Sequence, residues 1–282
     1  VGGTQTNLIT IGTALRPWQA VISTDKGHIN VHETGAIEAT GHKVLAMPSK
    51  DGKLTPAHIQ KALDLHTDEH MVQPKMVYIS NSTEIGTQYT KKELESLHHI
   101  CRQKGLYLFL DGARLGSALT SSVNDLTLED IAKLTDVFYI GGTKGGALFG
   151  EALVICHQDL KPDFRFMIKQ RGAMLAKGWL LGIQFDTLFT DGLYFEIAAQ
   201  ANVYAEKIRG AMEKKGYTLL APNHTNQIFA EMPDKDLESL GERFVYSYDR
   251  RVDDTHSCVR FCTGWATKEE NVDALVQAIE AL

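Results

Sequence analysis

Short apolar runs alternate with helical segments over the first 160 residues, and this alternation limits the possible fold more than any other feature of the chain. Six strands are predicted, at residues 21–24, 43–47, 75–80, 106–110, 136–140 and 152–156. Helices are predicted before or between them, at residues 5–15, 31–40, 55–66 and 91–104. Consecutive strands joined by helices pair in parallel through right-handed crossovers. The sequence therefore predicts an α/β fold with a mostly parallel central sheet covered by helices.

The pattern changes after about residue 164, where long helical segments replace the alternation. One of them runs over residues 193–215 and ends at Gly216. Three strands are then predicted, followed by a closing helix, at residues 227–231, 244–248, 257–263 and 268–282. Short strands and helices after a long connecting helix indicate a second, smaller α+β domain. We therefore expect a large domain over residues 1–204 and a small C-terminal domain over residues 205–282.

Composition and charge argue against two classes of partner. The 282 residues are 43% hydrophobic and 23% charged, as in ordinary globular proteins, and the formal net charge is −6. Because the chain has no lysine- or arginine-rich run, nucleic acid is not an expected partner. The longest apolar runs are far shorter than the ~20 residues that cross a bilayer, so a soluble protein without a membrane partner is expected.

The four cysteines lack the spacing of a zinc site, and they resemble small core residues in a reducing compartment. We therefore expect no metal site and a cytoplasmic location. The chain opens on Val1 without an initiator methionine, which indicates that an N-terminal segment is missing.

Lys144 lies in the glycine-flanked loop 141–146, directly after the predicted strand at residues 136–140. The glycines allow unusual backbone angles and close approach of a ligand, so the loop displays a long amine in a tight turn. Such an amine suits a Schiff base with a carbonyl group. A solvated turn residue or a phosphate contact is the alternative interpretation.

Asp111 follows the predicted strand at residues 106–110 and precedes Gly112. In open α/β sheets ligands bind outside the carboxyl ends of strands, so Asp111 and Lys144 can meet in one crevice. A lysine amine and an acidic partner for a pyridine nitrogen are what pyridoxal phosphate requires. Ordinary turn chemistry is the alternative for Asp111.

Two further sites have features that suit an anion. Gly3 and Thr4 open a predicted helix, whose free N–H groups suit a phosphate, although Thr4 could also act as a simple N-cap. Arg260 lies in a strand between Val259 and Phe261, and its forked guanidinium suits the carboxylate of an amino acid. An edge-strand arginine that faces water is the alternative.

These motifs occur together in the order seen in one known family. They comprise Gly3-Thr4, His28 within residues 27–33, the segments 110–114 and 143–146, and residues 259–261. With them the sequence resembles the threonine aldolases, in the β-eliminating lyase group of fold type I pyridoxal-phosphate enzymes. The resemblance covers nearly the whole chain. It implies an N-terminal segment, absent here, that supplies an active-site arm and substrate contacts.

The resemblance implies a role for each candidate residue. Lys144 forms the Schiff base with pyridoxal 5'-phosphate, Asp111 pairs with the pyridine nitrogen, and His28 stacks on the ring. Without the family, His28 would be interpreted as a polar turn residue. Gly3, Thr4 and Thr143 contact the cofactor, Arg114 reaches the phenolate oxygen or braces Asp111, and Arg260 binds the substrate's carboxylate. A surface ion pair is the alternative for Arg114.

The activity implied is cleavage of a β-hydroxy-α-amino acid, L-threonine or L-allo-threonine, to glycine and acetaldehyde. The resemblance also implies a homotetramer built from dimers with shared active sites. A β-eliminating lyase or an aminotransferase on the same scaffold remains an alternative. A non-catalytic homologue and a nucleotide-binding domain also remain, although no complete nucleotide-binding glycine motif stands in a strand–helix context.

The sequence departs from the family pattern at two places. A second histidine that handles the substrate hydroxyl in many members falls at Thr83 in our alignment. A phosphate-binding arginine from the neighbouring subunit falls near Leu175, which leaves Arg171 or Lys177 as substitutes. The identity of the general base is therefore open at the level of sequence.

Overall fold

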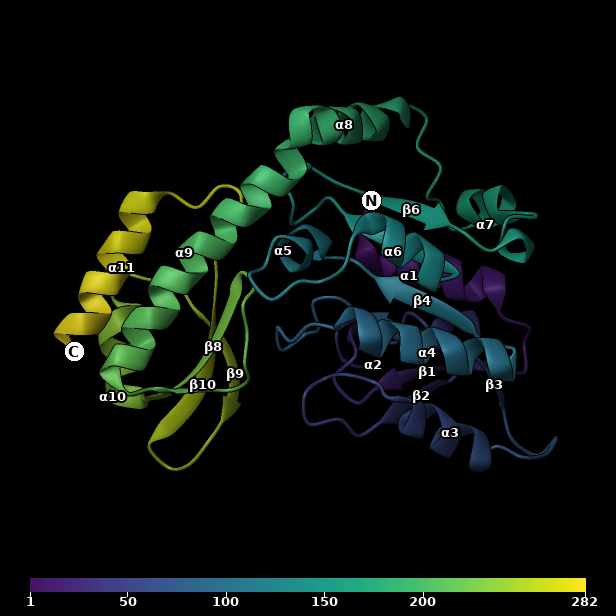
Figure 1. Cartoon of the computed structure of the whole chain (residues 1–282), viewed down its shortest axis with the longest axis horizontal. Coiled ribbons are helices and arrows are strands. Elements are labelled where there is room, and N and C mark those ends of the chain that lie inside the picture. Colours follow the sequence, from purple (N-terminus) through teal and green to yellow (C-terminus); the bar gives the residue numbers. More distant parts are fainter.

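A six-stranded sheet in the order β2-β1-β3-β4-β5-β6 forms the larger part of a computed structural model that describes residues 1–282 (Figure 1). Its strands are β1 (Gln19–Thr24), β2 (Val44–Met47), β3 (Gln73–Ser80), β4 (Tyr107–Asp111), β5 (Val137–Gly141) and β6 (Glu151–Ile155). Strands β1 to β5 pair in parallel, and β6 pairs antiparallel with β5 at one edge. The predicted α/β fold with a mostly parallel central sheet is confirmed.

Helices cover both faces of this sheet (Figure 1). They are α1 (Gly3–Ala14), α2 (His28–Val31), α3 (Pro56–Asp64), α4 (Lys91–Lys104), α5 (Leu115–Leu119), α6 (Leu128–Leu134), α7 (Phe164–Gln170) and α8 (Trp179–Phe189), with the short 3-10 segments η1 (Glu38–Thr40), η2 (Gln158–Leu160) and η3 (Thr190–Gly192). No helix of the chain has the length and hydropathy that a membrane crossing requires.

Side chains of the central strands alternate between two apolar cores. Val21 belongs to the core that includes Ile11 of α1, whereas the next residue, Ile22, belongs to the core that includes Leu94 of α4. Because both faces of the sheet are covered, its strands are continuous apolar runs rather than alternating ones. This burial holds the carboxyl ends of neighbouring strands in one fixed row.

A second sheet, in the order β7-β8-β10-β9, forms the C-terminal part and is antiparallel throughout. Its strands are β7 (Thr218–Leu219), β8 (Gln227–Pro233), β9 (Ser247–Arg251) and β10 (His256–Cys262), and its helices are α9 (Leu193–Lys215), α10 (Asp234–Gly241) and α11 (Glu269–Ala281). One apolar core joins this sheet to the three helices. The proposed domain boundary at residues 204 and 205 falls inside α9, which runs from one sheet towards the other (Figure 1), and it stays a prediction.

Two predicted elements are wrong. The helix expected at residues 31–40 is interrupted, because α2 ends at Val31 and both Thr34 (φ 53°) and Gly35 (φ 72°) adopt left-handed angles. The strand expected at residues 244–248 begins three residues later, at Ser247, because pairing with β10 aligns Ser247 with Arg260. Phe244 instead packs against the C-terminal apolar core.

Candidate active site

A cavity of about 120 Å³ lies beside the carboxyl ends of β3, β4 and β5. Seven of the eight candidate residues line it, namely Gly3, Thr4, His28, Asp111, Arg114, Thr143 and Lys144. They come from α1, from α2 and from the loops after β4 and β5, so the sheet brings together residues far apart in the sequence. Arg260 lines a different cavity.

Asp111 is the last residue of β4, and its side chain is held by three neighbours. Oδ1 accepts the N–H of Ala113 at 2.9 Å. Oδ2 accepts a hydrogen bond from Nδ2 of Asn7 at 3.1 Å and another from the hydroxyl of Tyr78. The first contact is typical of a turn, but the other two orient a buried carboxylate. Turn chemistry alone therefore does not account for Asp111.

Lys144 lies in the loop after β5, where Gly146 has a φ of 103° that a residue with a Cβ rarely adopts. The side chain is exposed where it borders the cavity. Desolvation lowers the pKa of Lys144, and the positive charge of Arg114 lowers it further against the attraction of Asp111 and Glu151. An ordinary solvated turn lysine lacks this environment.

His28 is the first residue of α2, and Glu33 fixes the orientation of its ring. Nδ1 of His28 lies 2.7 Å from Oε1 of Glu33. That hydrogen bond raises the pKa of His28 against the opposing effect of desolvation. The same Glu33 oxygen accepts Nδ2 of Asn7 at 2.7 Å, so Asn7 links Glu33 to Asp111. His28 and Asp111 thus belong to one hydrogen-bonded network.

Helix α1 points its first turn at the cavity through Gly3 and Thr4. Gly2 is its N-cap and offers no side-chain hydrogen bond, so the alternative interpretation of Thr4 as N-cap is wrong. The N–H groups of the first turn have no partner within the helix. A Cβ on Gly3 would lie 3.0 Å from the hydroxyl of Tyr139, so a larger residue there would crowd that side chain.

Arg114 lies just before α5 and makes no hydrogen bond or ion pair with Asp111, so the suggestion that it braces that carboxylate is wrong. It also makes no ion pair with any acidic side chain; the residue is partly buried, and desolvation lowers the pKa of its guanidinium. Its remaining role as a ligand contact stays a prediction.

Thr143 precedes Lys144, and its hydroxyl donates to Oε1 of Glu151 at 2.9 Å. The other oxygen of Glu151 accepts the N–H of Gly142 at 2.8 Å. Burial raises the pKa of Glu151. This carboxylate therefore holds the lysine loop from the start of β6.

Arg260 lies in β10, between β8 and β9, so the interpretation as an edge-strand arginine is wrong. It lines a cavity of about 620 Å³ that adjoins the first one. Its Nε is buried without a partner, and Nη1 lies 3.5 Å from Oε1 of Gln227. Guanidinium donors are thus available to an anion. Its charge also contributes to the lowered pKa of Lys144.

Sequence reasoning missed several residues that build the site. Tyr78 carried a usable signal, because it alternates with Ser80 along β3 and Ser80 is aligned with Asp111. Glu33 lies within the segment 27–33 that carries the family resemblance, but no spacing or motif marked it as a partner of His28. Asn7 had no signal, because it is 104 residues from Asp111 and reaches it only through packing.

Comparison with known proteins identifies the family. The model of the beta-eliminating lyase family matches residues 1–235. The low specificity L-threonine aldolase of Pseudomonas sp. (strain NCIMB 10558) is 32% identical, over 99% of this chain and 81% of that protein. The corresponding protein of Pseudomonas aeruginosa is 30% identical, over 98% of this chain and 80% of its own length.

Solved structures agree with this relationship. The threonine aldolase of Leishmania major is 54% identical and superposes with a TM-score of 0.98, over 99% of this chain and 82% of that one. An aspartate aminotransferase of Thermus thermophilus shares the fold alone, at 13% identity and a TM-score of 0.73, over 100% of this chain and 74% of its own. The chain therefore belongs to the beta-eliminating lyase family and, within it, to the threonine aldolases.

Proposed function

We propose that this protein is a pyridoxal 5'-phosphate-dependent aldolase that cleaves L-threonine or L-allo-threonine to glycine and acetaldehyde. One observation carries the proposal: a single cavity combines the amine of Lys144, the oriented carboxylate of Asp111 and the open first turn of α1. The names of the related proteins support the same activity.

The residues of the cavity fit pyridoxal phosphate. The free N–H groups at Gly3 and Thr4 suit its phosphate. Because Gly3 has no side chain, its backbone N–H faces the cavity without obstruction. Asp111 suits the pyridine N–H, and Lys144 suits the aldehyde. When bound, the cofactor forms a Schiff base with an amine and withdraws electrons from the α-carbon of the substrate.

The other residues bind and orient the reactants. The lowered pKa of Lys144 leaves a larger share of its amine neutral and nucleophilic. Glu33 orients His28, which we assign to the face of the cofactor ring. We assign Arg114 to the phenolate oxygen, Thr143 to the cofactor and Arg260 to the substrate's α-carboxylate, because its buried Nε lacks a partner.

Product analysis tests the function. Purified protein with added pyridoxal phosphate and L-threonine should release glycine and acetaldehyde. Proton NMR of the reaction mixture identifies both products. Release of 2-oxobutanoate and ammonia would identify a β-eliminating lyase, transfer of the amino group to an oxo acid would identify an aminotransferase, and no product would indicate a non-catalytic homologue. Lys144→Ala is the control and should abolish both turnover and borohydride trapping of the cofactor.

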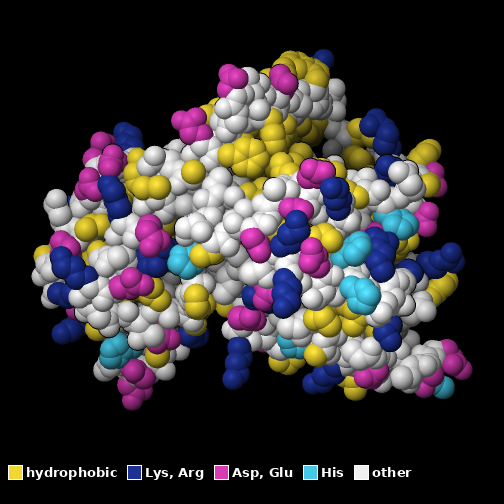
Figure 2. All heavy atoms as spheres, in the orientation of Figure 1, with side chains coloured by type: hydrophobic (Ala, Val, Ile, Leu, Met, Phe, Trp, Pro, Cys, Tyr) yellow, Lys and Arg dark blue, Asp and Glu magenta, His cyan; other side chains and the backbone are white.

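The proposed assembly is a homotetramer of dimers that share active sites. Exposed apolar side chains on and next to α8 support a protein interface, namely Leu148, Trp179, Leu180 and Ile183. Figure 2 shows hydrophobic atoms gathered at the edge where Figure 1 places α8. The four free cysteines support a cytoplasmic location.

A further inference from the structure

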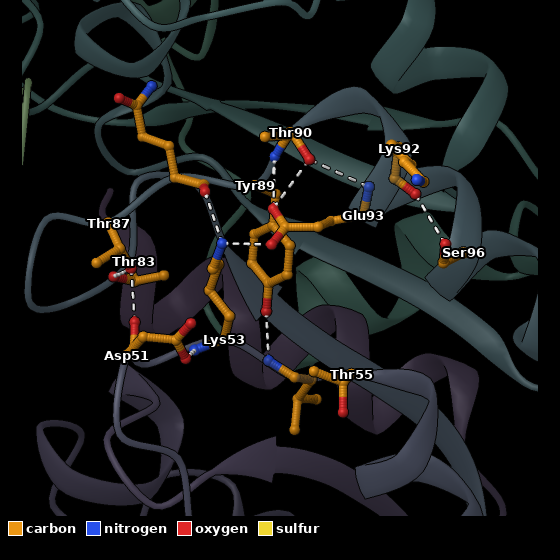
Figure 3. Close-up of polar contacts among 12 residues, drawn as sticks. Asp51, Lys53, Thr55, Thr83, Thr87, Tyr89, Thr90, Lys92, Glu93 and Ser96 are labelled. Atoms are coloured by element: carbon orange, nitrogen blue, oxygen red, sulfur yellow. Dashed lines mark hydrogen bonds and ion pairs between the residues drawn. The ribbon is translucent and has the colours of Figure 1, made fainter. Parts of the chain in front are cut away.

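Cleavage of a β-hydroxy amino acid requires a group that takes the hydroxyl proton, and the sequence left this group open. The family's second histidine aligned with Thr83, but the Thr83 hydroxyl is buried and lies 2.7 Å from that of Thr87. Thr87 in turn donates to the carbonyl oxygen of Asp51 at 2.6 Å, as Figure 3 shows. The Thr83 hydroxyl therefore stabilises its own loop and is not free to accept a substrate proton.

The next residue, Glu84, presents a carboxylate that is anchored at one oxygen and free at the other. Oε1 accepts the N–H of His28 at 2.8 Å and the hydroxyl of Ser80 at 2.7 Å. Oε2 makes no hydrogen bond within the protein. Unlike the buried unpartnered atoms of the chain, it keeps some contact with solvent. The side chain is thus oriented by protein contacts while one oxygen remains available to a ligand.

Glu84 also occupies the junction between two cavities. It lines the cavity that contains Lys144 and the larger one that contains Arg260, and it is the one residue that lines both. In the proposed function the substrate's amino group would lie beside Lys144, which it displaces from the cofactor, and its carboxylate would lie at Arg260. A substrate held at these two points lies against Glu84.

The other carboxylates near the cavity are already engaged. Glu33 is buried and bonded to Nδ1 of His28 and to Asn7, and we assign the His28 ring to the face of the cofactor. Glu151 holds Gly142 and Thr143 through both of its oxygens. Glu84 is therefore the carboxylate in this cavity that keeps an accessible, unpartnered oxygen.

We propose that Glu84 is the catalytic residue that takes the proton of the substrate's β-hydroxyl group, through Oε2. This inference rests on the proposed function. As the O–H bond breaks, its electron pair becomes the second bond of the aldehyde carbonyl, and the pair of the Cα–Cβ bond remains on Cα. The proton passes to Oε2, and Cα later takes one proton to give glycine. Glu84 returns its proton to solvent, so no proton is gained or lost over the cycle.

The surroundings of Glu84 suit this role. Desolvation raises its pKa above the ordinary value, against the opposing hydrogen bond from Ser80. A carboxylate with a raised pKa is a stronger base than one in water, which favours proton transfer near neutral pH.

The test compares Glu84→Gln with the parent in the cofactor-loaded protein. Glutamine keeps the size of the side chain and an oxygen for His28 and Ser80, but it removes the base. Threonine cleavage should fall by about a hundredfold or more. Glycine has no hydroxyl proton, so its affinity by calorimetry and the deuterium exchange of its α-proton should stay within about threefold of the parent.

Glu93→Gln is the matched control. Glu93 is a half-exposed glutamate on α4 that pairs with Lys53 at 2.5 Å (Figure 3) and does not line the cavity. This variant should match the parent in all three measurements.

Two results would overturn the proposal while the proposed function stands. One is a parent that cleaves threonine and a Glu84→Gln variant that cleaves it within about tenfold of the same rate. The other is a parallel loss of glycine affinity and cleavage, which would make Glu84 a structural support. A parent that releases no glycine from threonine would overturn the function and this inference together.

Glu84→Asp provides a second variant if Glu84→Gln does not fold. The shorter carboxylate withdraws from the substrate, so cleavage should fall about tenfold or more with glycine affinity unchanged. Cleavage at the parent rate would overturn the proposal.

Discussion

Hydrogen bonds between carboxylates and their neighbours fix the orientation of single side chains in the cavity. Asn7 donates to both Glu33 and Asp111, and Tyr78 donates to Asp111 from the neighbouring parallel strand β3. Two buried carboxylates near each other repel, and the shared amide offsets part of that repulsion. The chemistry of the site therefore depends on residues beyond Lys144 and Asp111.

Replacement of Asp111 tests its assignment to the pyridine nitrogen. Asp111→Ala should lower kcat by several orders of magnitude, on the order of 4 kcal/mol, because the cofactor becomes a weaker electron sink. Steady-state kinetics measures the loss, with the exposed Asp64→Ala as a control that keeps the parent rate. A loss of less than about tenfold would return Asp111 to a turn role.

Replacement of Arg260 tests the carboxylate site. Arg260→Ala should leave the absorbance of the bound cofactor intact while it weakens glycine binding by roughly 2–4 kcal/mol, because the substrate's charge loses its partner. Lysine should recover only part of this affinity, since it cannot donate two parallel hydrogen bonds. Calorimetric titration of glycine measures both variants, and unchanged affinity of the alanine variant would move the carboxylate site elsewhere.

The hydrogen bond between His28 and Glu33 makes a pH-dependent contribution to stability. The pKa of His28 in the folded protein is raised above its ordinary value of 6.5, so the folded protein binds the His28 proton more tightly than the unfolded chain does. The contribution is complete below pH 6.5 and is lost as pH rises through the folded value. Glu33→Gln should lower the pKa of His28 and reduce this slope. Histidine NMR titration and urea unfolding across this range measure the two effects, and an unchanged His28 pKa would contradict the assignment.

At the scale of elements, strand ends and helix starts decide where the site forms. The carboxyl ends of β3, β4 and β5 supply Ser80, Asp111 and the lysine loop, and α1 supplies its open first turn. Helix α4 lies outside the site, where it covers one face of the sheet and supports the strands that carry these residues. A substitution in α4 can therefore change the stability of the protein without changing the rate of catalysis.

The capping box of α4 allows a clean test of that separation. The Thr90 hydroxyl accepts the N–H of Glu93, and Glu93 accepts the N–H of Thr90, as Figure 3 shows. Thr90→Ala should lower the free energy of unfolding by about 1 kcal/mol and leave threonine cleavage unchanged. Ser96→Ala, on the exposed side of the same helix, should change stability by less than about 0.5 kcal/mol. Urea denaturation distinguishes the two, and equal effects would contradict the capping role.

At the scale of the whole molecule, the long helix α9 joins the two sheets, and contacts between them position Arg260 relative to Lys144. The Ser117 hydroxyl accepts the N–H of Asn226 at 3.0 Å, and the Thr263 hydroxyl donates to the carbonyl oxygen of Ala201 at 2.6 Å. These contacts tie β8 and β10 to α5 and α9. The substrate site proposed here depends on both sheets.

The exposed face of α8 predicts self-association. The apolar side chain of Ile183 is 53% exposed on this helix, so a charge there should oppose burial against a second copy. Ile183→Glu should reduce the proposed tetramer to smaller species in light scattering after size exclusion. Leu65→Glu, at a similarly exposed apolar site beyond the end of α3, should keep the parent's mass. Unchanged mass of the Ile183 variant would place the interface elsewhere.

Local patterns in the sequence were enough for the architecture of the sheet and for the positions of Asp111 and Lys144 at strand ends. Both follow from short-range properties, because apolar runs mark buried strands and parallel strands place their carboxyl ends at one edge. The same local reasoning failed at residues 31–40 and at the start of β9, where left-handed angles and pairing with β10 decide the structure.

Only the tertiary structure decided the environment of the candidate residues. Asn7 meets Asp111 across 104 positions of sequence, and Glu84 meets the backbone of His28 across 56. Such contacts, and the junction of the two cavities at Glu84, depend on how whole elements pack. Periodicity and turn chemistry act over a few residues, so the sequence by itself determined the strands of the central sheet, whereas packing determined which side chains share one site.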